Sequence, residues 1–303
     1  MKHNLWAISF LVTIFILAQI AGLAVTAHYI EKPALPMNIE RPEVPQEQQS
    51  YTFIPIFIFI LIATALGLLL IKFSMLKLWK FWFLLSVWLC LTISFNAFIP
   101  EKIAIGLAVI LALLKVFRPS VIIHNFTEIF IYGALAAIFV PILNVTAVIV
   151  LLVLISIYDY IAVRRTKHMV KLAEFQGKSK MFAGLLLPYK IKGGSEKMSG
   201  HISIGKNVKP IKAAGKEAAM LKEKQGVAIL GGGDIGFPLL FAGAVMKQFS
   251  LGLFDYRIFI VPLFAAISLF MLFLFANNKK YYPAMPYISA GCLAGYGIVR
   301  LLV

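Results

Sequence analysis

Charged residues and cysteines are scarce in this chain, and each shortage excludes a class of protein. Of the 303 residues, 14% are charged and 61% are hydrophobic, whereas soluble domains have about 25% charged and about 45–50% apolar residues. A soluble globular domain, a disordered chain and a fibrous repeat are therefore excluded. The two cysteines, Cys90 and Cys292, lie inside hydrophobic stretches without a spacing motif, which argues against a disulfide framework or a zinc site.

In place of charge, the chain has hydrophobic stretches about as long as a bilayer is thick. A hydrocarbon core of about 30 Å needs roughly 20 apolar residues in a helix. Nine such stretches predict an all-α polytopic membrane protein with nine transmembrane helices. They are 5–27, 52–71, 81–99, 103–117, 121–140, 142–163, 226–246, 257–276 and 283–303.

The boundary between the fifth and sixth stretches and the nature of the first stretch depend on particular residues. The break between the fifth and sixth stretches depends on Pro141 and Asn144 in an otherwise continuous apolar run. The first stretch, 5–27, is longer than the roughly 7–15 apolar residues of a signal peptide. We therefore expect it to be a retained helix, followed by an irregular external loop over 31–50, which is rich in Pro, Glu and Gln.

The basic residues predict the orientation. Segment 164–225 holds fifteen Lys/Arg and four Glu, which is typical of a cytoplasmic loop that contacts anionic lipid rather than of a nucleic-acid site. With the N-terminus cytoplasmic and the C-terminus outside, 23 Lys/Arg fall on the cytoplasmic side and 6 on the other. We expect a multi-pass protein of the cell membrane, organised as helices one to six (1–163), the basic loop (164–225) and helices seven to nine (226–303).

The basic loop also contains local patterns. Residues 164–176 place apolar residues at helical spacing among basic ones and predict an amphipathic helix on the membrane surface. Residues 181–188 are apolar but too short to span, so they predict an interfacial strand or a re-entrant segment. Residues 201–205 alternate as a short strand does.

Aspartate occurs three times, and two of the three lie inside hydrophobic stretches. Asp255 falls in a short external loop and is expected to be solvated, whereas Asp159 and Asp234 lie in the cytoplasmic halves of the sixth and seventh stretches. A carboxylate inside a membrane is costly and normally marks a function. Two carboxyl groups in contact share one proton, so one can act as a base on water while the other polarises a carbonyl. This is the chemistry of aspartyl proteolysis, and a proton-coupled secondary transporter that uses the same two aspartates is the alternative.

The sequence around Asp234 favours the protease. Gly231, Gly232 and Gly233 precede it, and each glycine in a helix costs about 1 kcal/mol relative to alanine. Such a run is better explained where the backbone bends or is closely approached. Pro238 cannot donate an amide to the carbonyl of Asp234.

A proline motif opens the last stretch. Two prolines in Pro283-Ala284-Met285-Pro286 restrict the backbone and leave carbonyl groups without helical partners. Backbone of this kind is tolerated at membrane depth where it lines a cavity. We expect the motif to lie beside the two aspartates, and a simple helix cap is the alternative.

Together these motifs resemble the presenilin and signal-peptide-peptidase family of GxGD intramembrane aspartyl proteases, most closely its archaeal presenilin-like members. The family has Tyr-Asp on its sixth helix, Gly-x-Gly-Asp on its seventh and Pro-Ala-Leu at the start of its ninth. The matching residues here are Tyr158-Asp159, Gly231-Gly232-Gly233-Asp234 and Pro283-Ala284-Met285-Pro286, with methionine in place of leucine. The order of the three motifs is more specific than any one of them.

The resemblance implies an enzyme, an aspartic endopeptidase that cleaves transmembrane segments of other membrane proteins or signal peptides. A helical substrate has to unwind, and strand addition supplies new partners for its amides. The family is thought to use strands flanking its sixth and seventh helices, for which 181–188 and 227–230 are the candidates here. As in signal peptide peptidase, no obligatory accessory subunit is expected.

Neither a metal nor a cofactor is expected. The five histidines are scattered and form no cluster with Cys or Glu at metal-ligand spacing: His3, His28, His124, His168 and His201. A transporter would be expected to show inverted repeats, and none is visible. A non-enzymatic scaffold gives no reason for aspartates inside two spans.

Overall fold

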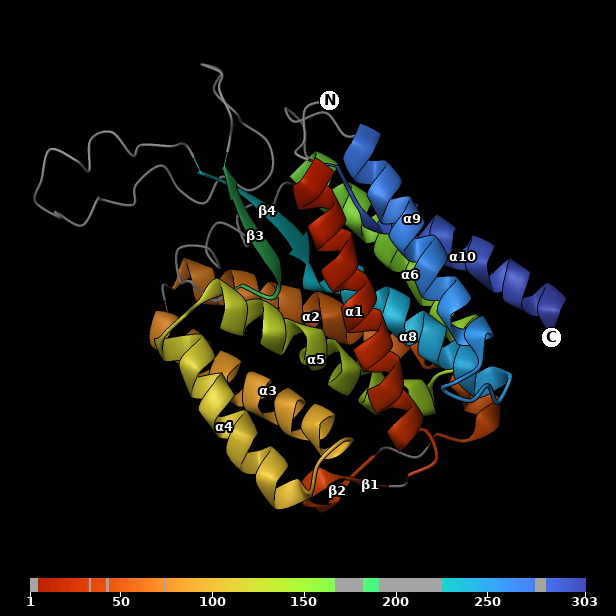
Figure 1. Cartoon of the computed structure of the whole chain (residues 1–303), viewed down its shortest axis with the longest axis horizontal. Coiled ribbons are helices and arrows are strands. Elements are labelled where there is room, and N and C mark those ends of the chain that lie inside the picture. The colour runs from red at the N-terminus through yellow and green to blue at the C-terminus, as the bar shows by residue number, and fades with distance from the viewer. Residues whose placement is uncertain are drawn as a thin grey trace, which may run out of the picture.

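The computed structural model describes residues 5–32, 34–41, 44–73, 75–166, 182–190, 225–275 and 282–303. These ranges contain nine α-helices of 16 to 25 residues: α1 (Leu5–Tyr29), α2 (Phe53–Lys72), α3 (Leu76–Asn96), α4 (Glu101–Phe117), α5 (Val121–Phe139), α6 (Val145–Ile161), α8 (Gly232–Gln248), α9 (Ile260–Phe275) and α10 (Met285–Leu302). The predicted helical membrane fold is confirmed in the coarser form of a mostly helical chain, which also contains two small β-sheets (Figure 1).

Seven of the helical segments are long and apolar enough to cross a membrane. The helices α4 and α8 have 17 residues each and fall just short of the 18 that this criterion requires. The count of nine spans, the side on which each terminus lies and the division at 163 and 225 therefore remain predictions.

The break between the fifth and sixth stretches is present where Pro141 and Asn144 predicted it. A 3₁₀ turn, η3 (Val140–Ile142), ends α5, and Asn144 caps α6 by accepting a hydrogen bond from the amide of Ala147 at 2.8 Å. Proline removes a helical donor and the asparagine side chain replaces a lost acceptor, so one helix stops and the next begins within a few residues.

The stretch 226–246 is not a helix throughout. Its first residues form the strand β4 (Gln225–Gly231), which pairs antiparallel with β3 (Gly184–Lys190) so that Gly184 lies opposite Gly231. Residues 184–188 of the first candidate segment, and all of the second, 227–230, are therefore strands in the structure. Polar backbone at this depth needs partners, and pairing between the two segments supplies them.

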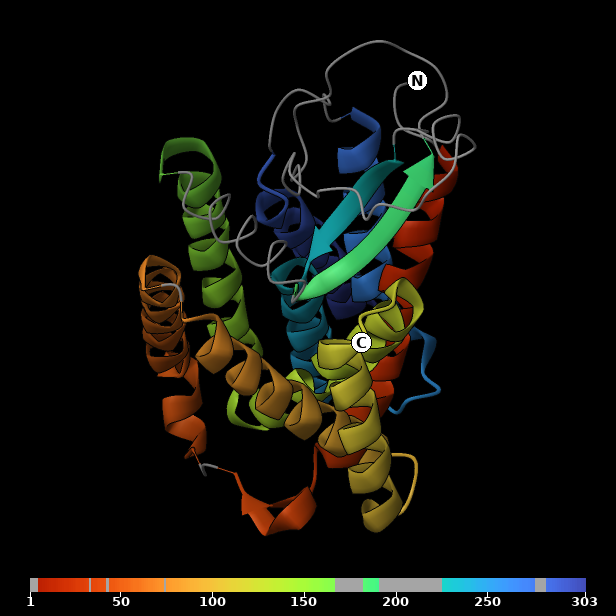
Figure 2. The ribbon, with the colours of Figure 1, turned by 90° about the vertical axis from the view of Figure 1, so that its left-hand side faces the viewer.

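The two small sheets lie at opposite ends of the helical bundle. The β3–β4 pair lies at the end where α1 begins (Figure 2), whereas β1 (Ala34–Leu35) and β2 (Ile39–Glu40) lie at the far end (Figure 1). Among the described residues, short elements that include the 3₁₀ turns η1 (Pro36–Asn38) and η2 (Gln46–Tyr51) connect α1 to α2, as expected for the loop over 31–50. The predicted helix over 164–176 from residue 167 onward and the predicted strand over 201–205 lie outside the described residues.

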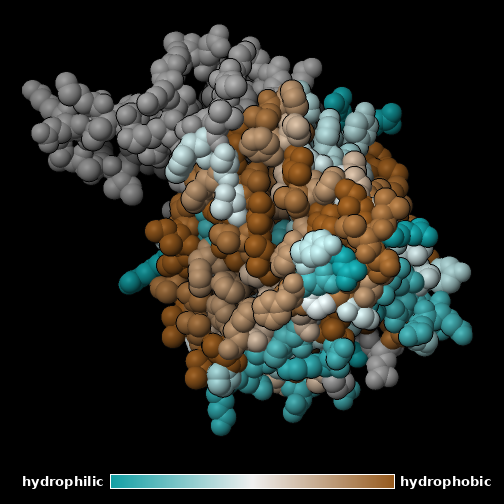
Figure 3. All heavy atoms as spheres, turned by 45° about the vertical axis from the view of Figure 1, so that its right-hand side comes forward, coloured by the Kyte–Doolittle hydropathy of each residue, from teal (hydrophilic) through white to brown (hydrophobic). Residues whose placement is uncertain are grey.

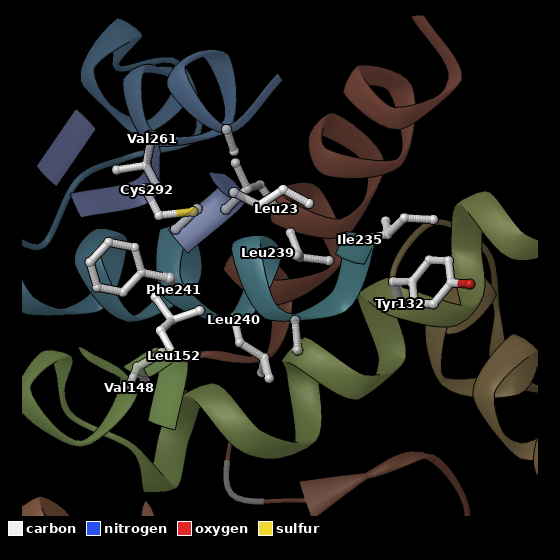
Figure 4. Close-up of a cluster of buried hydrophobic side chains, with 14 of the residues drawn as sticks. Leu23, Tyr132, Val148, Leu152, Ile235, Leu239, Leu240, Phe241, Val261 and Cys292 are labelled. Carbon is white, nitrogen blue, oxygen red and sulfur yellow. The ribbon is translucent and has the colours of Figure 1, made fainter. Parts of the chain in front are cut away.

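The core is built around α8, which packs against α1, α5, α6, α9 and α10. Ile235, Leu239 and Phe241 of α8 are completely buried. Figure 4 shows the side chains that meet them from the surrounding helices: Leu23, Tyr132, Val148, Leu152, Val261 and Cys292. This central position holds the first turn of α8, and therefore Asp234, in a fixed place in the bundle.

Apolar side chains also cover the outside of the molecule. In Figure 3 hydrophobic residues cover much of the face shown, and hydrophilic residues gather mainly along its lower and right-hand margins, with a smaller hydrophilic patch near its middle. The helix α2 lies at the margin of the bundle with almost all of its side chains outside the core. A surface of this kind is stable when it contacts lipid tails rather than water.

Candidate active site

Asp159 lies in the last turn of α6, and its side chain is only 7% exposed. Its Oδ2 accepts a hydrogen bond from the backbone nitrogen of Met285 at 3.2 Å, and the amide of Ala284 also bonds to the carboxylate. Ala284 is the N-cap of α10 and Met285 its first residue, so these amides have no helical partners of their own. The carboxylate thus occupies the N-terminus of α10, where the helix dipole favours negative charge.

A second contact fixes the same helix pair one turn away. The hydroxyl groups of Ser156 on α6 and Ser289 on α10 lie 2.9 Å apart and share a hydrogen bond. Three residues after Asp159 the chain leaves α-helical geometry for a π-helical turn, Ala162–Thr166. Such turns often occur near functional sites because they displace the backbone from the regular helix.

Asp234 lies in the first turn of α8, three residues after the N-cap Gly231. Its carboxylate accepts a hydrogen bond from the backbone of Gly231, which is the arrangement of a capping box. The side chain is partly exposed, and the charge of Asp159 acts on it. The two carboxyl groups therefore lie near enough for the charge of one to act on the other. Asp159 lies at the N-terminus of α10 and Asp234 at that of α8.

The three glycines before Asp234 differ in their surroundings. The amide of Gly232 donates to the carbonyl of Ala183 at 3.1 Å, and a Cβ at Gly232 would lie 2.8 Å from the hydroxyl oxygen of Tyr132. A Cβ at Gly233 would meet only ordinary contacts with Phe237. The close approach that the glycine run predicted is thus real at Gly232.

The other predicted motif residues surround Asp159. Tyr158 precedes it on α6 and is half-buried, and Pro283 is buried just before α10. Pro286 occupies the first turn of α10. The motif Pro283–Pro286 therefore starts α10 and also contacts Asp159 through the backbone amide of Met285. The expectation that this motif lies beside an aspartate is confirmed at Asp159.

Sequence reasoning missed Gly184, the first residue of β3. Its φ of 143° is a backbone conformation that residues with a side chain rarely adopt, and an added Cβ would lie 2.2 Å from the carbonyl oxygen of Leu230. The sequence signal was only a glycine in an apolar run. Sequence reasoning also missed a group of buried polar side chains from α4 and α5 that contact β3, described below.

Among the described residues no group of three or more His, Cys, Asp or Glu side chains could hold a metal ion. Of the histidines, His3, His168 and His201 lie outside the described ranges, and His124 contacts β3 rather than either aspartate. The two carboxylates can perform acid–base chemistry without a metal. That no metal or cofactor takes part remains a prediction.

The chain is similar to known proteins in sequence and in fold. The sequence model of the family described as signal-peptide peptidase, presenilin aspartyl protease, matches residues 12–303. A solved structure of a presenilin family intramembrane aspartate protease in space group C222 aligns with a TM-score of 0.63 and 18% identity, over 98% of this chain and 99% of that chain. A structure of such a protease in space group P2 gives a TM-score of 0.56 and 17% identity, over 97% of both chains.

A comparison with curated protein sequences gave no match. At these identities the structural likeness concerns the fold alone, whereas the family match covers nearly the whole chain. It confirms the predicted enzyme class and the multi-pass membrane character. The chain therefore belongs to the signal-peptide-peptidase and presenilin family of aspartyl proteases.

Proposed function

We propose that this protein hydrolyses peptide bonds within transmembrane segments of membrane proteins or signal peptides, with water activated between Asp159 and Asp234. One observation carries the proposal: two carboxyl groups from different helices interact electrostatically inside a membrane protein, and backbone amides orient each of them. A carboxylate inside a membrane is energetically costly, so its presence there normally marks a function.

The chemistry follows from a pair of carboxyl groups that share one proton. The ionised carboxylate removes a proton from water, and the water oxygen bonds to the carbonyl carbon of the substrate. The protonated carboxyl group donates its proton to the carbonyl oxygen, which gives a tetrahedral diol. As the C–N bond breaks, the protonated carboxyl group gives its proton to the leaving amine. The ionised carboxylate takes a proton from one hydroxyl group of the diol, so the carboxylic acid product forms and the pair again holds one proton.

Presentation of the substrate is supported by the position of β4. A transmembrane helix hides its amides in its own hydrogen bonds, so the scissile segment has to become extended. The strand β4 ends at Gly231, three residues before Asp234. A substrate strand added beside β4 would be directed toward the aspartates.

The proposal also covers the location and the partners of the enzyme. No family or structural match supports the transporter alternative. We propose that the enzyme resides in the cell membrane and acts without an obligatory accessory subunit. We also propose that its basic segment 164–225 contacts anionic lipid.

The test is cleavage of a single-span reporter by the purified protein in detergent and in liposomes. Asp159→Asn and Asp234→Asn keep side-chain size but remove the shared proton, so each should abolish cleavage in protein that remains folded. Asp255→Asn is the matched control, because Asp255 pairs with Arg257 in a loop. Substantial activity in either of the first two variants would remove that aspartate from the catalytic role.

A further inference from the structure

A group of polar side chains is buried beside β3, away from the two aspartates. We call it the strand anchor, and none of its members is more than 8% exposed: Lys115, His124, Asn125, Thr127, Glu128 and Tyr132. It comprises one residue of α4 and five of α5. Burial of so many polar groups is costly unless each is hydrogen-bonded, and the proposed hydrolysis does not use them.

The strand anchor binds the backbone of β3. The amide of Asn125 donates from Nδ2 to the carbonyl of Leu186 at 2.7 Å, and its Oδ1 accepts from the amide of Leu186 at 2.9 Å. These are the two bonds that a neighbouring strand would make. At Gly184, the amide donates to Oε2 of Glu128 at 3.0 Å, and the carbonyl accepts from Nε2 of His124 at 2.7 Å.

These bonds determine which edge of the sheet is occupied. Successive residues of a strand direct their amide and carbonyl groups to opposite sides. Gly184 and Leu186 face α5, so Leu185 and Leu187 face β4, in agreement with the observed pairing. From residue 184 to residue 187, β3 therefore has partners along both edges, and α5 takes the place of a third strand.

Glu128 connects this edge to the rest of the strand anchor. Its Oε1 accepts from Nζ of Lys115 at 2.5 Å, and its Oε2 accepts from the hydroxyl of Tyr132 as well as from Gly184. Lys115 also donates to Oγ1 of Thr127 at 2.9 Å. The lysine thus neutralises a carboxylate whose remaining lone pairs hold the start of β3.

The strand anchor reaches the glycines before Asp234 by two routes. Gly184 lies opposite Gly231 in the sheet, and the amide of Gly232 donates to the carbonyl of Ala183. Tyr132 lies against Gly232, where it leaves no room for a side chain. A shift of β3 along α5 would therefore displace the first turn of α8.

We infer that Asn125 and Glu128 are positioning residues of this protease. They fix β3 against α5 and thereby hold Asp234 in place, and they close the outer edge of β3 so that an extended substrate can add only to β4. The inference rests on the proposed function, because it concerns how an extended segment reaches Asp234. Neither residue touches the reacting atoms.

The experiment measures the turnover rate, KM and the masses of the products from a single-span reporter peptide. Asn125→Leu keeps the shape of the side chain but removes both bonds to Leu186. We expect kcat per folded enzyme to fall on the order of tenfold, and the products to spread over bonds neighbouring the main cleavage position. A smaller folded fraction alone would lower the rate without moving the cleavage position.

A second pair of variants separates hydrogen bonding from charge. Lys115→Met with Glu128→Gln removes both charges but keeps an acceptor for the amide of Gly184, whereas Lys115→Met with Glu128→Leu removes the acceptor too. We expect the first double variant to keep most of the wild-type product pattern and the second to lose it. Asn96→Leu is the matched control, because the amide of Asn96 bonds to Tyr29 on another helix, and its products should not change.

Failure of this inference can be distinguished from failure of the proposed function. If the wild-type protein cleaves the reporter in a manner that Asp234→Asn abolishes, the proposed function stands. Folded Asn125→Leu with wild-type kcat and cleavage positions would then overturn the inference alone. Should Asn125→Leu not accumulate, Asn125→Ser decides, because serine is small and polar yet cannot make both bonds to Leu186.

Discussion

The backbone nitrogen of Met285 lies 3.2 Å from Oδ2 of Asp159, across 126 positions of sequence. The amide is free to donate because it stands in the first turn of α10, where no carbonyl lies four residues earlier in the helix. The last turn of α6 and the first turn of α10 are thereby joined at the carboxylate. In this way a helix start, which any sequence with suitable prolines could form, becomes part of the candidate site.

Replacement of both prolines of the motif Pro283–Pro286 should show whether the motif only starts α10 or also holds Asp159 for hydrolysis. With Pro283→Ala and Pro286→Ala, residue 282 could become helical and α10 could extend backward, so the amides of Ala284 and Met285 would bond to carbonyls instead of to Asp159. We expect hydrolysis to fall about tenfold or more, with little loss of folded protein. The matched control is Pro262→Ala, in the first turn of α9. Full activity in the double variant would show that the motif is only a helix cap.

Gly184→Ala should disrupt the β3–β4 pair. The φ of 143° is strained for alanine, and its Cβ would collide with the carbonyl oxygen of Leu230, so a cost of about 1–3 kcal/mol is expected from strain alone. Thermal unfolding in detergent should show a lower midpoint, and kcat/KM per folded enzyme should fall. Gly106→Ala is the control, since no atom lies within 4 Å of its added Cβ. Equal behaviour of the two variants would contradict the geometry of β3.

Lys115→Met should destabilise the protein, and a second substitution that removes the charge of Glu128 should restore most of the lost stability. The pair with Glu128 is buried, with 2% of each side chain exposed, and an unpaired buried charge costs about 3–5 kcal/mol. Addition of Glu128→Gln should recover most of the loss in unfolding midpoint. Arg257→Met breaks the partly exposed pair with Asp255 and should have a smaller effect. If Lys115→Met had no greater effect than Arg257→Met, the charge of Glu128 would not depend on Lys115.

Chelation should leave proteolysis intact. The proposed chemistry uses two carboxyl groups and water, and no metal cluster occurs among the described residues. Activity of the purified enzyme should persist in EDTA and should be inhibited by peptides with a hydroxyl group at the scissile position, which imitate the tetrahedral diol. Loss of activity in EDTA that zinc restores would contradict an aspartyl mechanism.

Much of the helical plan could be predicted because it depends on local composition. The first stretch, predicted over 5–27, is the helix α1 over 5–29, and the break at Pro141 and Asn144 is present. The length of an apolar run can be read directly from the sequence, and a proline or a capping asparagine ends or starts a helix within a few residues. The order of Tyr158-Asp159, the glycine run and Pro283–Pro286 likewise indicated the family without any distance.

The start of the stretch 226–246 shows where local patterns fail. Hydrophobicity alone cannot distinguish a short buried strand from the first turns of a helix. That β4 is a strand depends on β3, which is itself held by α5. The facing residues of the two strands are 35 positions apart at Lys190 and Gln225 and 47 positions apart at Gly184 and Gly231. Its conformation is therefore decided by partners outside the stretch.

The sequence by itself determined where apolar helices form, that Asp159 and Asp234 lie within them, and which family has these motifs in this order. Only the tertiary structure decided that Met285 bonds to Asp159 and that Asn125 and Glu128 hold β3. Lys115 shows the difference, since in the sequence it is a lysine within the apolar stretch 103–117, whereas in the fold it is buried against Glu128. The reason is physical: hydrophobic burial is encoded residue by residue along a helix. A hydrogen bond between distant segments exists only once helix packing has brought donor and acceptor within about 3 Å of each other.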